Sequence, residues 1–220
     1  MNWDWSAVSG HQSLAGTTWG VYTLTGTYDG DTFTMTRPPM LGRQDPGGPV
    51  APAPSVELAT PCPEPPGGWR VLDPSRATYE AMERTFEAAR RLEGYAGSWM
   101  DQSINPARSG RAEAEDLLMN DPTRLIINVM VTGDTTAAEA RLRETWGGAL
   151  CVCPARHTET ELLHVLDEVL TTPGMLTAGT GRDHVELQVV YDDGSLQREL
   201  DAKFGVGLVV VASAVRPHHG

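Results

Sequence analysis

Apolar residues follow two different spacings along the second half of the chain. Between Pro74 and Leu92 they recur at steps of three and four residues, which predicts a helix. Residues 124–131 are apolar at nearly every position, which is typical of a strand covered on both faces. In residues 184–191 apolar and polar positions alternate, so we expect a strand with one face in water.

The same two patterns predict the remaining elements of this half. Further strands are expected at 68–73, 96–102, 149–153 and 206–215, and further helices at 135–146, 159–170 and 195–204. Thr158 and Glu161 have the spacing of a capping box, which marks the start of the helix at 159–170. Strands and helices in this order predict an α+β fold.

Two strand-helix-strand segments, 124–154 and 184–215, match each other at a constant offset of 58 residues without a gap. The matched pairs include Val131 with Val189, Asp134 with Asp192, Leu142 with Leu200, Trp146 with Phe204, Leu150 with Leu208 and Val152 with Val210. Two tandem βαβ repeats in one sheet predict a ferredoxin-like duplicated fold. The helix at 159–170 is then an insertion. We expect this helix, the first βαβ unit or the N-terminal hairpin to cover the second face of the sheet.

Prolines divide the chain into three regions. Ten of the sixteen prolines lie in residues 38–66, so we predict a Pro/Gly-rich linker or strap at 41–66. It separates an N-terminal β-hairpin unit at 1–40 from an α+β domain at 67–217. Because the first unit is too small to hold its own core, we expect it to dock on the domain.

The N-terminal unit is predicted to contain a hairpin at 25–36 that turns at Asp29-Gly30. This turn pairs Thr27 with Thr32 and leaves a row of threonines in solvent. The opposite face carries larger apolar side chains and is expected to pack. The residues expected to fill the contact between hairpin and sheet are Trp3, Trp5 and Trp19.

Charge and hydropathy exclude two classes of partner. The net charge of −12 argues against nucleic acid, because a phosphate backbone selects for a basic surface. The longest apolar run, 206–215, is about half of a bilayer span, so no membrane segment is predicted. The first residues lack a basic region followed by an apolar core, which predicts a cytoplasmic protein and leaves open a signal removed by processing.

The cysteines are one set of candidate functional residues. Their odd number, three, favours a reducing compartment over a disulfide framework. Cys151 and Cys153 share a face of a predicted strand, and with His157 they are candidate metal ligands. A one-residue gap within a strand does not reverse the chain as zinc sites require, so buried thiols packed as small apolar groups are the main interpretation and no metal or other cofactor is predicted. Cys62 could bridge to only one of the other two.

A helical stripe is the second set. His157, Glu161 and His164 are spaced so that a carboxylate lies one turn from each imidazole, which suits acid-base catalysis. An exposed, ion-paired helix face is the alternative.

Two resemblances accompany these patterns. The segment YDGDTFT, residues 28–34, resembles the first hairpin of thermonuclease-type oligonucleotide barrels, where acidic residues near the turn help to bind calcium; Asp29 and Asp31 are the corresponding residues. The segments WDWSAVSGHQ, PCPEPPGGW, WGGALCV and FGVGLVVVASAVRP, together with the same hairpin, resemble a family of uncharacterised actinobacterial proteins with a high genomic GC content. That resemblance implies no activity.

The sequence therefore predicts a non-enzymatic binding or interaction module, a monomer or homodimer with a protein or small-molecule partner. The alternative is a small hydrolase-like or metal-dependent enzyme. It would use the His157, Glu161 and His164 stripe, or Cys151 and Cys153.

Overall fold

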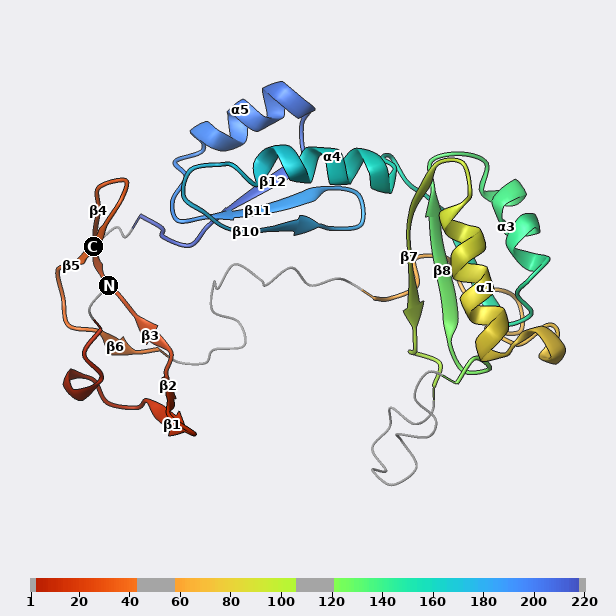
Figure 1. The fold of residues 1–220 in the computed structure, drawn as a ribbon, viewed down its shortest axis with the longest axis horizontal. Coiled ribbons are helices and arrows are strands. Elements are labelled where there is room, and N and C mark those ends of the chain that lie inside the picture. Colours follow the sequence, from red (N-terminus) through yellow and green to blue (C-terminus); the bar gives the residue numbers. More distant parts are fainter. Residues whose placement is uncertain (1–2, 43–57, 106–120, 218–220) are drawn as a thin grey trace.

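The computed structural model describes residues 3–42, 58–105 and 121–217 (Figure 1). Short strands make up an N-terminal unit, and two compact α+β units follow it along the chain. We call these the first module, residues 74–154, and the second module, residues 159–215. The segment at residues 58–73, which leads into the first module, is called the strap. Residues 43–57, 106–120 and 218–220, which include most of the predicted linker and His218 and His219, lie outside the described residues.

The α+β class is confirmed. The N-terminal unit contains η1 (Trp5–Ala7), β1 (Gln12–Leu14), β2 (Thr17–Trp19), β3 (Tyr22–Thr23), β4 (Gly26–Tyr28), β5 (Phe33–Met35) and β6 (Met40–Leu41). The first module contains η2 (Pro74–Arg76), α1 (Tyr79–Arg90), β7 (Tyr95–Asp101), β8 (Ile126–Val131), α3 (Thr135–Arg143) and β9 (Ala149–Pro154). The second contains α4 (Glu159–Val169), β10 (Met175–Thr180), β11 (Val185–Val189), α5 (Ser195–Phe204) and β12 (Val209–Ser213).

Both modules have the same order of elements: helix, two antiparallel strands, helix, and a strand parallel to the middle one. In each, the two helices lie on one face of a three-stranded sheet (Figure 1). The repeat is therefore longer than the predicted βαβ unit. Helix α4 is the counterpart of α1 and not an insertion, and β10, which was not predicted, is the counterpart of β7.

The two modules do not share a sheet, so the single ferredoxin-like sheet is not formed. The strand orders are β7-β8-β9 and β10-β11-β12. In each sheet the middle strand has a hairpin partner on one edge and a parallel partner on the other. Neither β8 nor β11 has an edge left for the other module.

The gapless alignment of the repeats is wrong by one residue at the last strand. Ile127 pairs with Leu150 in the first module, whereas Val185, its counterpart, pairs with Val209, one position beyond the expected partner. Counted between paired residues, the connection from β11 to β12 is one residue longer than the connection from β8 to β9. Because a one-residue slip exchanges the two faces of a strand, Val209 is buried and Val210 is 44% exposed.

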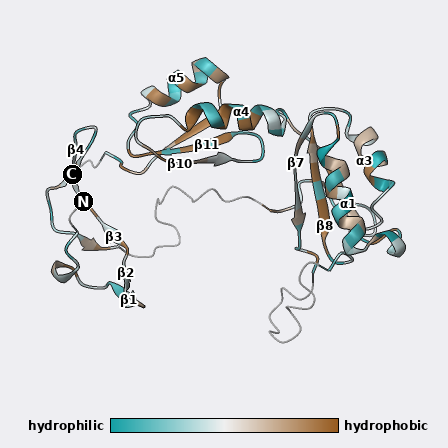
Figure 2. Cartoon of the chain, in the orientation of Figure 1, coloured by the Kyte–Doolittle hydropathy of each residue, from teal (hydrophilic) through white to brown (hydrophobic). Residues whose placement is uncertain are grey.

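Each module has one apolar core between its helices and its sheet. The buried core of the first module comprises Ala81, Ala89, Leu125, Ile127, Val129, Val131, Ala138, Leu142, Trp146 and Leu150. That of the second comprises Leu162, Val165, Val169, Val185, Leu187, Val189, Leu200 and Val209. Figure 2 shows β8 as hydrophobic along most of its length, which agrees with the predicted burial on both faces. Among the described residues, no helix is long and apolar enough to cross a bilayer.

The chain around the first helix differs from prediction. Residues 68–73 form no strand, because the amide groups of Leu72 and Asp73 both donate to the Gly147 carbonyl oxygen, at 2.7 and 3.0 Å, and not to a neighbouring strand. Pro74 opens the short η2, and α1 begins only at Tyr79, where the Thr78 hydroxyl accepts a hydrogen bond from the Ala81 amide.

The hairpin of the N-terminal unit pairs Thr27 with Thr34, so the predicted pairing with Thr32 is wrong. The Asp29 carboxylate accepts hydrogen bonds from the amides of Asp31 and Thr32, at 3.0 and 2.8 Å, and this widens the turn to four residues. Asp29 is thus engaged by the turn itself. Thr27, Thr32 and Thr34 are exposed, as predicted.

The tryptophans of the N-terminal unit do not close a contact with the sheet. Trp3 and Trp5 pack against Tyr22, with ring centroids 5.4 and 6.3 Å apart, and Trp19 is exposed. Toward the modules, Tyr28 lies edge-on against Tyr191 at 6.3 Å, while the hydrogen bonds described for residues 3–42 stay within the unit.

Candidate functional site

Of the predicted acid-base stripe, Glu161 and His164 lie on the outer face of α4, and His157 precedes the helix. The Glu161 carboxylate closes a capping box, accepting hydrogen bonds from the Thr158 amide and hydroxyl at 2.7 and 2.9 Å, and these bonds lower its pKa. His164 is 3.4 Å from Glu168, and its side chain is 76% exposed. The His157 amide donates to Asp183. None of the three lines either of the two cavities described for the molecule.

The cysteines are arranged differently from the prediction. Cys62 and Cys151 form a disulfide with their Cα atoms 5.8 Å apart, so the expectation of three reduced thiols is wrong in this structure. The bond joins positions separated by 89 residues, which is why spacing alone did not reveal it. Cys153 is the free thiol of the described residues, and burial raises its pKa against the opposing effect of Arg182. Within the described ranges, no group of three or more His, Cys, Asp or Glu side chains could hold a metal ion.

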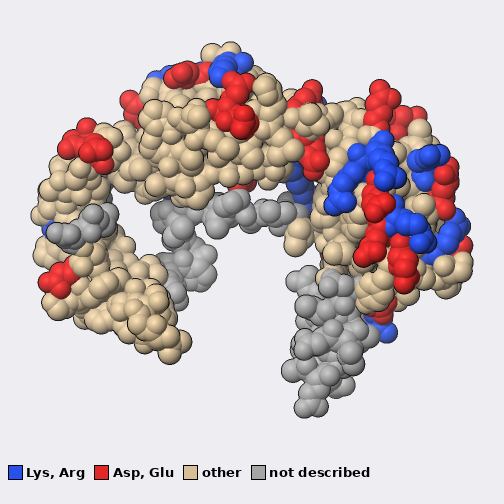
Figure 3. Space-filling model, viewed as in Figure 1, with Lys and Arg blue, Asp and Glu red and all other residues tan. Residues whose placement is uncertain are grey.

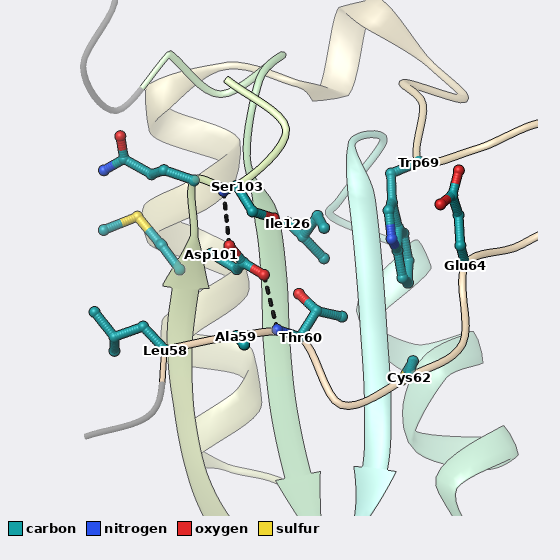
Figure 4. Close-up of a pocket in the computed structure, with 11 residues that line it drawn as sticks. Leu58, Ala59, Thr60, Cys62, Glu64, Trp69, Asp101, Ser103 and Ile126 are labelled. Atoms are coloured by element: carbon teal, nitrogen blue, oxygen red, sulfur yellow. Dashed lines mark hydrogen bonds between the residues drawn. The ribbon is translucent and has the colours of Figure 1, made fainter. Parts of the chain in front are cut away.

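The strap crosses the second face of the first sheet (Figure 4), and three contacts anchor it there. The Trp99 indole N–H donates to the Leu58 carbonyl at 2.9 Å. The Thr60 amide donates to the Asp101 carboxylate at 2.7 Å. The Cys62–Cys151 disulfide forms the third anchor and lies against Ile126 and Ala149. The strap therefore covers the part of this face around Ile126, and α4, one of the expected covers, contacts β7 beside Met130.

A cavity of about 790 Å³ lies between the strap and the sheet. Its lining residues are Leu58, Ala59, Thr60, Cys62, Glu64, Trp69, Met100, Asp101, Gln102, Ser103 and Ile126. Most of this surface is apolar. Figure 4 shows Asp101 and Glu64 on opposite sides of Ile126, with Trp69 beside Glu64. The cavity thus has an apolar middle and a carboxylate at each end.

Asp101 is the most constrained polar group of this cavity and is only 5% exposed. Burial acts to raise the pKa of its carboxyl, but hydrogen bonds from Ser103 and Thr60 outweigh burial and hold the pKa below its usual value. The carboxylate is therefore charged at neutral pH. No ion pair of Asp101 with a basic side chain is found in the described part of the chain, and no Lys, Arg or His lines the cavity.

Arg182 joins the second module to the strap. Its guanidinium carbon lies 4.5 Å from the centroid of the Trp99 ring, and its Nη2 donates to the Ala59 carbonyl at 2.7 Å. Beneath this junction, Asn128 is 0% exposed, and its Oδ1 has no hydrogen-bond partner in the described residues. Arg182 thus contacts the outer side of the strap and is not part of the cavity lining.

Sequence reasoning missed Asp101, Thr60, Glu64 and Trp69 as site residues. The one available signal was the strand at 124–131, whose apolar character on both faces requires a cover. The Pro-rich segment was the unassigned part of the chain beside it.

Figure 3 shows basic and acidic side chains interspersed over α1 and α3. Comparisons with protein-family models, curated proteins and solved structures find no match for this chain. The predicted resemblances to actinobacterial proteins and to thermonuclease-type barrels therefore stay predictions.

Proposed function

We propose that the protein is a non-enzymatic binding module whose small-molecule ligand occupies the cavity between the strap and the first sheet. The observation that carries this proposal is the cavity itself: about 790 Å³ of mostly apolar space with a few polar groups, the usual character of a small-molecule site. Its walls are held by a disulfide and two hydrogen bonds, so the site is largely preformed.

The chemistry of the lining favours binding over catalysis. No His lines the cavity, and Cys62 is in a disulfide. Asp101 accepts hydrogen bonds from two backbone amides, and its lowered pKa makes it a weak proton acceptor at neutral pH. The enzyme alternative at His157, Glu161 and His164 has no enclosing cavity in the described structure to exclude water.

The disulfide also bears on where the protein would work. A Cys62–Cys151 bond persists in oxidising compartments and is rare in the cytosol. We therefore propose an oxidising environment in place of the predicted cytoplasmic one. Mass spectrometry after thiol alkylation, on protein isolated from its native cells without reductant, tests this. One alkylated cysteine supports the proposal, and three contradict it.

Nuclear magnetic resonance with labelled Ile, Leu and Met methyl groups tests the site. A library of neutral, anionic and cationic fragments should contain ligands that shift the methyl signals of Ile126, Leu58 and Met100. Ala59→Trp, which adds a bulky ring to the cavity lining, should abolish these shifts. Ala140→Trp, on the exposed face of α3, is the matched control and should leave them unchanged. A library that shifts none of the three signals would contradict the proposed function.

A further inference from the structure

We infer that the cavity between the strap and the first sheet binds an aliphatic diamine, a short hydrocarbon chain with an ammonium group at each end. This inference rests on the proposed function and names the ligand class of that site. Three features of the lining carry it: the sign of its charges, their placement, and the polar groups available at each end.

The charges of the lining are all negative. Among the described residues that line the cavity, Glu64 and Asp101 are the only ionisable side chains, since Cys62 is in a disulfide. Arg182 is near, but it engages the Ala59 carbonyl and the Trp99 ring. A negative cavity with no basic lining residue attracts cations and repels phosphates and carboxylates.

The placement of the charges favours a ligand with two separated cationic groups. Figure 4 shows the carboxylates at opposite ends, with Ile126 and Trp69 between them. An apolar stretch of wall gains free energy when it is covered by methylene groups, at about 0.8 kcal/mol for each CH₂ that leaves water. A chain with one ammonium group would leave the second carboxylate without a partner.

The Asp101 end can satisfy an ammonium group. Each carboxylate oxygen accepts one backbone amide, from Ser103 at 2.7 Å or Thr60 at 2.7 Å, and each retains further acceptor capacity. The Thr60 hydroxyl is buried beside the same carboxylate, whose pKa it helps to lower, and its oxygen keeps acceptor capacity. A –NH₃⁺ group has three donors, and here it finds a charged acceptor and an unused neutral one.

The opposite end pairs a carboxylate with an aromatic ring. Glu64 is exposed, and Trp69 is half-buried beside it (Figure 4). Indole is the aromatic group that attracts cations most strongly. A divalent metal ion fits less well, because calcium requires six or more oxygen ligands around one point and these two carboxylates stand apart.

Isothermal titration calorimetry with 1,4-diaminobutane and its homologues from three to six carbons tests the inference. The best diamine should bind about fivefold more tightly than 1-aminobutane, because one exposed ion pair is added. Thr60→Val keeps the strap amide and should weaken diamine binding about threefold to tenfold through the lost hydroxyl. Glu64→Gln should remove the advantage of the diamine over 1-aminobutane.

Matched controls show whether binding depends on the carboxylates of the cavity or on the net charge of the protein. Glu83→Gln removes the same charge from an exposed position on α1 and should leave the diamine affinity unchanged. Equal binding of 1,4-butanediol and 1,4-diaminobutane would overturn the inference. So would diamine binding that Glu64→Gln and Thr60→Val leave intact.

Different outcomes would contradict the proposed binding function and the diamine inference. If no diamine binds but neutral or anionic fragments shift the Ile126 and Leu58 methyl signals, the diamine inference is wrong and the binding site stands. If no compound of any charge shifts them, the binding function itself is wrong.

Discussion

The two modules share their order of elements but differ on the second face of the sheet. In the first, Ile126 lies beside the strap, and Met130 lines a cavity with residues of α4 and of the β10–β11 loop. Both are buried, and so is Asn128. In the second, the positions 58 residues later are His184, Glu186 and Gln188, which are half-buried, and the neighbouring Val210 is exposed. The residues of each central strand thus indicate whether the sheet face without helices is buried. The cover itself comes from a distant part of the chain.

The covered face depends on anchors that the open face does not require. The strap contributes neither helix nor strand before η2, so few of its backbone groups can be paired regularly. Ordering such a segment costs conformational entropy of about 1–2 kcal/mol per residue. A disulfide, a hydrogen bond to a buried carboxylate and a hydrogen bond from Trp99 offset this cost.

Removing the Cys62–Cys151 disulfide should produce the largest difference in stability between the two modules. We expect Cys62→Ala to destabilise the first module by about 4–5 kcal/mol, since the bond closes a long loop, with a sequence separation of 89. Hydrogen exchange followed by mass spectrometry should show faster exchange in β7, β8 and β9 and little change in β10, β11 and β12. Cys153→Ser retains the disulfide and serves as the control. An equal loss of protection in both modules would mean that they unfold as one unit.

Each module has an aromatic residue near the C-terminal end of its second helix, Trp146 or Phe204, and removing it should give the next largest difference in stability. Trp146 is 0% exposed, and its indole N–H donates to the Ala149 carbonyl at 2.9 Å. Trp146→Ala should cost about 3–5 kcal/mol. Phe204→Ala should cost about 1–2 kcal/mol, because Phe204 is only half-buried. Urea unfolding of the two variants measures both values, and equal losses would show that the second core is as dense as the first.

Replacing the polar residue at the centre of the helix-free face of each sheet tests whether the two faces differ in burial. Asn128→Leu should stabilise the first module by about 1 kcal/mol, because the unpartnered Oδ1 is removed from a buried site. Glu186→Leu should change stability by less than about 0.5 kcal/mol, because its surroundings are already hydrated. Thermal unfolding compares the two. A destabilised Asn128→Leu variant would show that the hydrogen bond from its Nδ2 to the Ile126 carbonyl, at 3.3 Å, outweighs the buried Oδ1.

Acid should loosen the strap once the pH falls below the usual pKa of an aspartate. The lowered pKa of Asp101 means that its charged form stabilises the folded state above the usual value of 3.8, and that this stabilisation is lost as the pH falls through the folded value. The Ile126 methyl signal, followed between pH 7 and pH 3, should report the change. Asp101→Asn should flatten this pH dependence. An unaltered titration in that variant would assign it to other carboxylates.

The positions of most helices and strands in the modules could be predicted from periodicity. The capping box at Thr158 and Glu161 marked the start of α4 to the residue. Strand β10 was missed because its sequence, MLTAGT, has small and polar residues in place of a clear alternation. The predicted alignment of the two last strands failed because one extra residue in the connection from β11 to β12 leaves no clear mark in an apolar run.

The candidate site could not be predicted, because its residues come from regions with no local relation. Thr60 and Trp69 belong to the strap, Asp101 ends β7, and Ile126 begins β8. Periodicity reports which face of an element is buried and gives no information on what buries it. The histidines considered as catalytic residues, His157 and His164, are spaced as two turns of a helix are. His164 lies on the exposed face of α4 and His157 just before that helix, so the spacing reflects the helix and not a site.

The sequence by itself determined most of the elements, the α+β class and the presence of a repeat, because these depend on contacts between residues close in the chain. It also determined that β8 needed a cover on both faces. Only the tertiary structure decided that the repeats form two sheets, that the strap and α4 supply the cover, and that Cys62 bonds to Cys151. Those features rest on contacts between residues up to about ninety positions apart, where loop closure costs little more for one pairing than for another and spacing carries no signal.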